Sequence, residues 1–228
     1  MGDASITLTL SGISSVLESQ YFPPIELSPK KRYALGLVEL LTFNSIPNID
    51  STCNGLKIGE KIVRLPTGSY EIADIGKYIQ QNSKKTDFSL TANNNTLKSV
   101  IKCSEAIDFA VENSIAPLLG FSRITLEPNQ SHTSSTPVRI LKFNVIRVEC
   151  NITTGAYINN NKVHTIHEFF PAVAPGFKII EIPSKIIYQP IHVNSIENIQ
   201  LKIVDEDGDL IDFRGETITI RLHIKSLK

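Results

Sequence analysis

The sequence contains no tryptophan, carries no net charge and has no long apolar run, and each absence excludes a class of protein. Lysine plus arginine equals aspartate plus glutamate at 23 each among 228 residues, so no overall basic field attracts nucleic acid. The neutral balance also lowers the repulsion between copies of the chain. No apolar stretch approaches the roughly 20 residues that span a bilayer, and the N-terminal residues lack the basic start and apolar run of a signal peptide. We therefore expect no specific nucleic-acid partner and no membrane span.

Motifs for catalysis are also absent. The three cysteines, Cys53, Cys103 and Cys150, are far apart and form no CxxC pair, and we interpret them as reduced, buried thiols. The chain has neither a GxSxG nucleophile motif nor a glycine loop that would cradle a phosphate. We therefore predict a protein that is not an enzyme, with no catalytic residues, no cofactor-binding residues and no metal ligands.

The clearest pattern is the alternation of polar and apolar residues over Thr217–Lys225. A period of two is typical of a β-strand with one face in the core. The apolar face holds Ile218, Ile220, Leu222 and Ile224. We predict that Leu222→Asp abolishes soluble folding, because an unpaired buried carboxylate costs several kcal/mol. We predict that His223→Asp is mild, because this side chain points outward or toward a second layer.

Other strands follow the same logic. Tyr33–Asn44 is apolar on both faces, which is typical of a central strand covered on both sides. Leu56–Leu65 and Val145–Ile152 are predicted strands. Tyr21–Pro24 is predicted to interrupt any regular ladder, because proline lacks the N–H group that pairing needs.

Two segments favour helix. Apolar residues recur at Ile72, Ile75 and Ile79, an amphipathic helical pattern, and Ser69 is the predicted cap at its start. Ser114–Phe121 is predicted to be a short helical turn closed by glycine.

These patterns predict an all-β fold, a single jelly-roll β-sandwich of two antiparallel sheets with one or two short helices. Spacing between strands is irregular and no internal repeat is visible, which argues against a propeller or a β-solenoid. Because no linker-like stretch interrupts the chain, we expect one domain over residues 1–228.

Two short strings resemble metal sites. His164, His167 and Glu168 could ligate zinc, but the histidines are three residues apart rather than the four of the zinc helix motif, in a context that favours strand or loop. Asp205–Asp209 is acidic like a calcium loop, but it lacks the EF-hand register and an Asp-Gly pair between strands favours a hairpin turn. We predict structural roles for both and no stoichiometric metal.

Two basic runs, Lys30–Arg32 and Lys84–Lys85, are short, are not interleaved with aromatic residues and have acidic residues nearby. This pattern favours a solvated surface over a nucleic-acid contact.

Several strings, in their order along nearly the whole chain, resemble the minor capsid (penton) protein of Polinton/Maverick elements, the virus-like transposons also called adintoviruses. They are Tyr21–Leu27, Phe43–Asn48, Pro66–Ile72, Leu118–Phe121, Val163–Pro171, Pro175–Glu181 and Phe213–Thr219.

The resemblance implies a structural protein of the virion, made inside the host cell. It implies homopentamers at the fivefold vertices of an icosahedral shell, beside a double-jelly-roll major capsid protein. Three polar or proline-rich segments are long enough to embrace a neighbouring copy: Glu18–Lys31, Glu127–Pro137 and Thr153–Lys162.

Distant adenovirus pentons carry an added domain and an integrin-binding Arg-Gly-Asp. Here the string is Arg214-Gly215-Glu216, we expect no room for a large insertion, and receptor binding is not carried over. The alternative is a jelly-roll ligand- or receptor-binding module of lectin type, although the lack of tryptophan leaves few rings for sugar stacking. A cupin-like metal oxidase is third.

Overall fold

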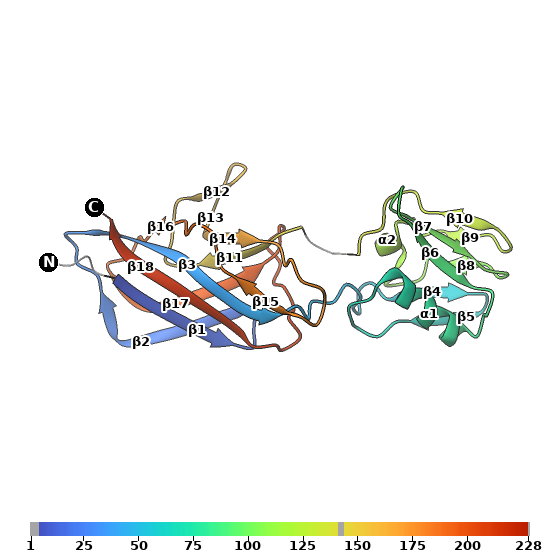
Figure 1. The fold of residues 1–228 in the computed structure, drawn as a ribbon, viewed down its shortest axis with the longest axis horizontal. Coiled ribbons are helices and arrows are strands. Elements are labelled where there is room, and N and C mark those ends of the chain that lie inside the picture. The colour runs from blue at the N-terminus through green and yellow to red at the C-terminus, as the bar shows by residue number, and fades with distance from the viewer. Residues whose placement is uncertain (1–4, 141–143, 228) are drawn as a thin grey trace. The chain divides into compact units, whose positions relative to one another are not determined.

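The computed structural model describes residues 5–140 and 144–227, and the chain divides into two compact units (Figure 1). Unit 1 comprises Met1–Ile46 and Phe143–Lys228, and unit 2 comprises Pro47–Lys142. The single domain and the lack of room for an insertion, both expected from the sequence, therefore differ from what is found. Each unit buries its own apolar cluster, but neither boundary has the proline-, glycine- or charge-rich composition that marks a linker.

Unit 1 is a jelly roll of two antiparallel sheets, as the sequence predicted. One sheet has the order β1-β18-β3-β15, with β16 also pairing with β3, and the other has the order β14-β11-β17-β2. The strands of the first sheet are β1 (Ser5–Gly12), β18 (Ile218–Leu227), β3 (Arg32–Phe43), β15 (Lys178–Glu181) and β16 (Gln189–Pro190). Those of the second are β14 (Thr165–Phe169), β11 (Ile146–Cys150), β17 (Ser195–Val204) and β2 (Val16–Glu26).

The pairing order carries the assignment to the jelly roll. The strands of the orders β1-β18-β3-β15 and β14-β11-β17-β2 can be numbered together, from first to last, in the order in which they occur along the chain. In the first of these sheets the first strand pairs with the last, the last with the third, and the third with the sixth. In the other sheet the second pairs with the seventh, the seventh with the fourth, and the fourth with the fifth. This alternation between two sheets is the jelly-roll arrangement. Unit 2 is inserted between the third and fourth of these strands.

The alternation at the C-terminus produces the core of unit 1. Ile218, Ile220, Leu222 and Ile224 are each fully buried, and β18 lies between β1 and β3. His223 on the other face contacts a second layer, as predicted. Its Nδ1 lies 2.8 Å from the hydroxyl of Tyr188 and its Nε2 2.6 Å from Oγ of Ser5. The segment containing Tyr188 passes close over Gly36, where a Cβ would lie 2.4 Å from Cγ2 of Ile186.

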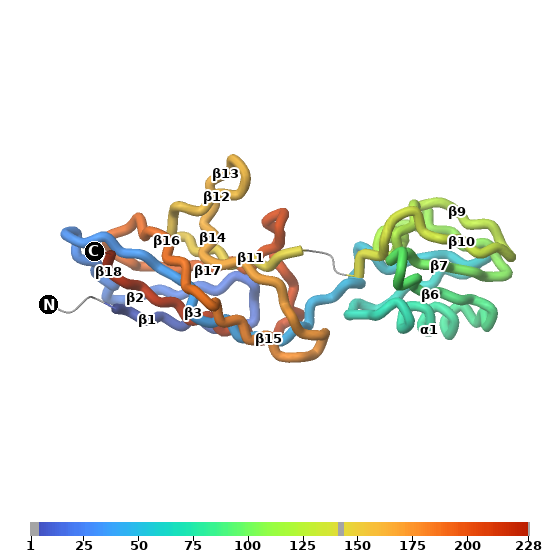
Figure 2. Tube along the Cα trace, turned by 45° about the horizontal axis from the view of Figure 1, so that its top comes forward, coloured from blue at the N-terminus to red at the C-terminus, as the bar shows by residue number. Residues whose placement is uncertain are grey.

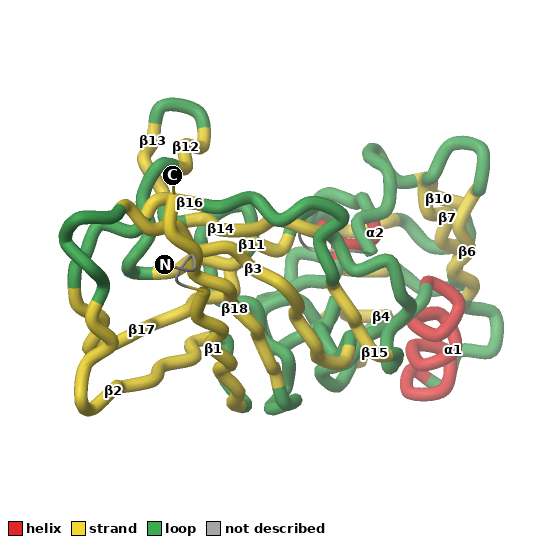
Figure 3. The backbone as a smooth tube through the Cα atoms, turned by 60° about the vertical axis from the view of Figure 1, so that its left-hand side comes forward, coloured by secondary structure: helices red, strands yellow, loops and turns green. Residues whose placement is uncertain are grey.

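Unit 2 contains two small antiparallel sheets, and both helices of the described residues belong to it (Figure 3). One sheet has the order β5-β4-β8-β9, formed by β5 (Lys61–Arg64), β4 (Gly55–Ile58), β8 (Ile107–Asp108) and β9 (Thr125–Leu126). The other has the order β10-β7-β6, formed by β10 (Ser131–Thr133), β7 (Lys98–Lys102) and β6 (Ser89–Asn93). The helices are α1 (Ile72–Ser83) and α2 (Ala116–Leu119).

Helix α1 was predicted correctly except at its start. Ile72, Ile75 and Ile79 are buried as expected, but the N-cap position is Glu71 rather than Ser69, without a side-chain cap hydrogen bond. Gly76 faces Leu90 of β6, where an added Cβ would lie 3.4 Å from the Cβ of Leu90, so this glycine permits close packing of helix on sheet.

Two further differences concern local structure. Leu56–Leu65 is a hairpin of β4 and β5 rather than one strand, because Gly59 at φ +54° reverses the chain. Of the three cysteines, Cys103 and Cys150 are buried as predicted, whereas Cys53 is half-buried. Burial raises the pKa of the Cys150 thiol to about 11, so this thiol is a poor nucleophile at neutral pH.

The short helical turn α2 ends at Gly120, whose φ is +78°, as predicted.

Candidate interaction groove

The residues that resembled a zinc site do not converge. His164 lies before β14, and its Nδ1 is 2.6 Å from the carbonyl oxygen of Thr153. His167 contacts Glu181, with Nε2 2.8 Å from Oε1. Glu168 accepts from Nε of Arg147 at 2.9 Å. Among the described residues no group of three or more potential ligands could hold a metal ion, and the absence of a metal remains a prediction.

The acidic string Asp205–Asp209 is a turn, as predicted. The amide of Asp205 donates to the carbonyl oxygen of Asp209 at 3.0 Å, and Oδ1 of Asp205 accepts from the amides of Asp207 and Asp209. Gly208 has a φ of +89°, which glycine adopts without strain. The side chain of Asp205 therefore stabilises the turn by accepting hydrogen bonds from the backbone of the turn.

Glu206 in this turn fixes the chain where it re-enters unit 1. Its carboxylate accepts the amide of Asn144 at 3.0 and 2.9 Å and the Asn144 side-chain amide at 2.9 Å. Burial raises the pKa of Glu206, but hydrogen bonds from its own amide, Asn144 and Val145 outweigh that effect and leave the pKa below its ordinary 4.5. Because the folded-state pKa is depressed, this stabilisation is present above pH 4.5 and is lost as the pH falls through the folded-state value.

We expect Glu206→Gln to destabilise unit 1 by about 1 kcal/mol at pH 7, since the exposed clamp loses charge-assisted hydrogen bonds. Urea unfolding at pH 7 and pH 3 measures this, and the difference from the unsubstituted chain should shrink at pH 3. Asp207→Asn, in the same turn but without a hydrogen bond from Asn144, is the control. An undiminished difference at pH 3 would contradict the proposed role of the ionised carboxylate.

The basic runs lie on the surface. Lys30, Lys31 and Arg32 are exposed; the two lysines lie in the turn between β2 and β3, and Arg32 is the first residue of β3. Lys84 is the exposed C-cap of α1. Lys85 forms an ion pair with Glu105. The hydrogen bond between the two side chains raises the pKa of Lys85.

Sequence reasoning missed a groove in unit 1, with a volume of about 600 Å³. One wall is the hairpin of β12 (Ala156–Ile158) and β13 (Asn161–Val163), which rises from the sheets (Figure 2). The other sides are β14 and the segment 181–189. No sequence pattern placed residues 156–168 beside residues 181–189.

The groove follows the free edge of a sheet. β14 ends the order β14-β11-β17-β2, and consecutive residues of this strand, Thr165 to Glu168, line the groove. Because neighbouring strand residues point to opposite faces, a groove lined by all of them must run along the strand's edge. Thr165 is 7% exposed, and its hydroxyl has no hydrogen-bond partner within the described part of the chain.

The described residues thus form a jelly roll with an inserted unit, and a groove runs beside one edge of the jelly roll. The chain is similar in structure to the mavirus penton protein, known from a crystal structure of the selenomethionine-labelled protein. The TM-score is 0.54 at 13% sequence identity, over 98% of this chain and 100% of the other. At this identity the similarity establishes a shared fold, over residues of both units. No protein-family model matches the chain, and no curated protein shows significant similarity to it.

Proposed function

We propose that the chain is a penton-like minor capsid protein, a non-enzymatic structural component of a virion. The observation that carries the proposal is the jelly-roll pairing order together with a separate unit inserted between its third and fourth strands. The fold shared with the mavirus penton protein over 98% of the chain supports it.

The finer proposal concerns assembly. The chain forms homopentamers at the fivefold vertices of an icosahedral shell, next to a double-jelly-roll major capsid protein, in particles of a Polinton/Maverick (adintovirus) element. The strings quoted above support the assignment to these elements. The proposal includes no specific nucleic-acid partner and no membrane span; no helix among the described residues has the length and apolar character needed to cross a bilayer.

A ligand-binding module of lectin type is the alternative, and the groove is the observation in its favour. Tyr157 is the one phenylalanine, tyrosine or tryptophan among the residues that line it, whereas sugar sites commonly stack rings on such side chains. Binding on a glycan array would favour this alternative.

Co-assembly tests the proposal. Expressed with the major capsid protein of the same element, the chain should occupy the fivefold vertices as five copies, visible by electron cryomicroscopy of the shells. Shells made without the chain are the control and should show empty vertices. Shells that close their vertices without the chain, and never take it up when it is present, would contradict the proposal.

A further inference from the structure

Unit 1 carries an exposed apolar projection on the edge opposite the groove. Strand β2 pairs with β17 from Val16 to Gln20 and again at Ile25 and Glu26. Between these stretches, Tyr21–Pro24 stands opposite the single residue Glu197. The four residues therefore bulge out of the ladder, as the two prolines predicted.

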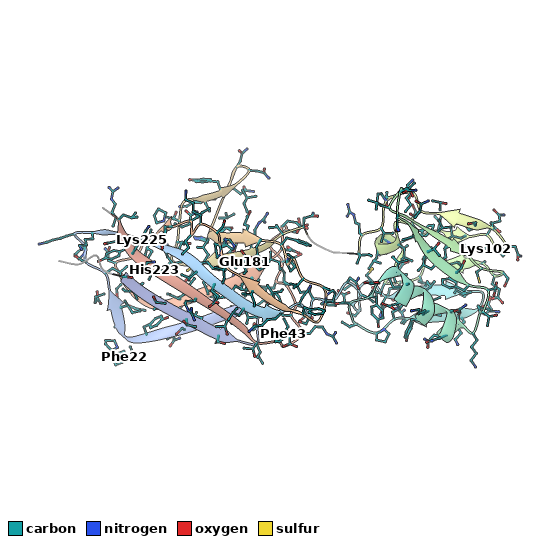
Figure 4. The ribbon with its side chains drawn as sticks, in the orientation of Figure 1. Phe22, Phe43, Lys102, Glu181, His223 and Lys225 are labelled. Atoms are coloured by element: carbon teal, nitrogen blue, oxygen red, sulfur yellow. The ribbon has the colours of Figure 1, made fainter. Side chains whose placement is uncertain are left out.

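The bulge holds one aromatic ring in solvent. Phe22 is fully exposed (100%), and Figure 4 shows it projecting from unit 1 beyond β2. Tyr21 and Ile25 on either side are partly buried against the core, so the protruding residues are anchored at both ends. Aromatic residues, phenylalanine included, are enriched at protein–protein interfaces, so an exposed ring that is anchored on both sides suits a contact surface.

The bulge and the groove lie on opposite edges of the same sheet, since β2 and β14 are the two ends of the order β14-β11-β17-β2. The hairpin wall of the groove and β2 accordingly lie at opposite sides of unit 1 (Figure 1). A bulge on one edge cannot reach the groove on the other edge of its own chain. It can reach the groove of a second copy, and repeating that step joins copies head to tail, the kind of contact that closes into a ring.

The two surfaces are complementary in character. The groove volume of about 600 Å³ is above the roughly 300 Å³ at which ligand pockets begin, so it accommodates Phe22 together with Pro23. Its apolar lining includes Ile158, Val163 and Ile187, the last 61% exposed. Among the described residues no further strand pairs with the outer edge of β14, so this edge can form hydrogen bonds with an incoming backbone.

The charged residues of the groove and of the bulge are complementary as well. The two carboxylates that line the groove are engaged, Glu168 by Arg147 and Glu181 by His167. Lys185 at the groove forms no ion pair within the described residues. Glu26, next to the bulge, is exposed and contacts Ser195. A bulge seated in the groove brings a carboxylate and an ammonium group that each lack an ion-pair partner among the described residues toward one another.

We infer that the Tyr21–Pro24 bulge of one copy, led by Phe22, inserts into the β12–β13–β14 groove of the next copy, and that this contact builds the ring. The inference rests on the proposed homopentamer and names its contact surfaces. The bulge lies within Glu18–Lys31, and strand β12 of the groove lies within Thr153–Lys162, two of the three segments that the sequence marked as able to embrace a neighbour.

Engineered disulfides test the contact. In a Cys53→Ser background, which removes the half-buried thiol, we expect Phe22→Cys with Ile187→Cys to give a ladder of covalent species ending at five on non-reducing gels. Mixing the two single variants should stop at a covalent dimer, because each chain then contributes one cysteine. Phe22→Cys with Phe177→Cys is the matched control: Phe177 is 65% exposed and lies outside the groove lining.

A second variant tests the inferred contact separately from the proposed homopentamer. Phe22→Ser should raise the concentration for half-dissociation of the ring at least tenfold, and Phe177→Ser should leave it unchanged. A ring in the unsubstituted chain, with no ladder and no effect of Phe22→Ser, would overturn the inference and leave the pentamer standing. A ladder that passes five would support the contact and overturn the pentamer. Equal cross-linking of the control pair would also overturn the inference.

Discussion

Leu222→Asp should leave almost no soluble protein with a folded unit 1. Leu222 is fully buried in β18, between Leu8 of β1 and Leu37 of β3. A carboxylate there has no partner, and burying it costs several kcal/mol. A domain is stable by only about 5–15 kcal/mol, so most or all of that margin is lost. Soluble yield and thermal unfolding measure the loss.

His223→Asp is the matched control, one residue away on the opposite face. A carboxylate at this position can still accept hydrogen bonds from Tyr188 and Ser5, and Lys225, whose Nζ lies 3.6 Å from the centre of the Tyr188 ring, is a nearby cation. We expect a cost of about 1–2 kcal/mol, that of altered hydrogen bonds. Equal thermal shifts for the two variants would contradict the strand register.

Phe109→Ala should destabilise unit 2 and leave unit 1 intact. Phe109 is fully buried and stacks on Phe121 with ring centroids 5.4 Å apart. Removing a buried phenylalanine ring costs about 3–5 kcal/mol, because the transfer term and the cavity add. Hydrogen exchange should show faster exchange in β4, β7 and α1 but unchanged protection in β3 and β18.

Ile124→Ala is the control for this substitution, since Ile124 is also in unit 2 but 54% exposed; its exchange pattern should match that of the unsubstituted chain. The expectation depends on the two units having separate cores. Faster exchange in β3 and β18 as well would mean that the units unfold together and would refute their independence.

Sequence patterns predict the elements of this fold well where one physical cause dominates. Alternation over nine residues determines β18, because its two faces meet core and surface. Apolar residues on both faces mark β3 as central, and Gly120 ends α2 because the chain needs a positive φ there. These signals are local, and tertiary contacts reinforce them.

The parts that could not be predicted depend on contacts between distant residues. The amino-acid composition does not change at the boundaries of unit 2, so the sequence predicts one continuous domain. The groove requires β14 to lie beside 181–189, which only the folded order of strands determines. The prolines at 23 and 24 predicted an interrupted ladder, but only the burial of Tyr21 and Ile25 on either side shows that Phe22 is the residue left in solvent.

Native mass spectrometry of the purified full-length chain across a concentration series tests the central claim most directly. The account predicts a species with five times the mass of one chain, populated increasingly as the concentration rises and stabilised when the major capsid protein is present. A chain that remains a monomer or a dimer at every concentration, with and without that protein, would contradict the account.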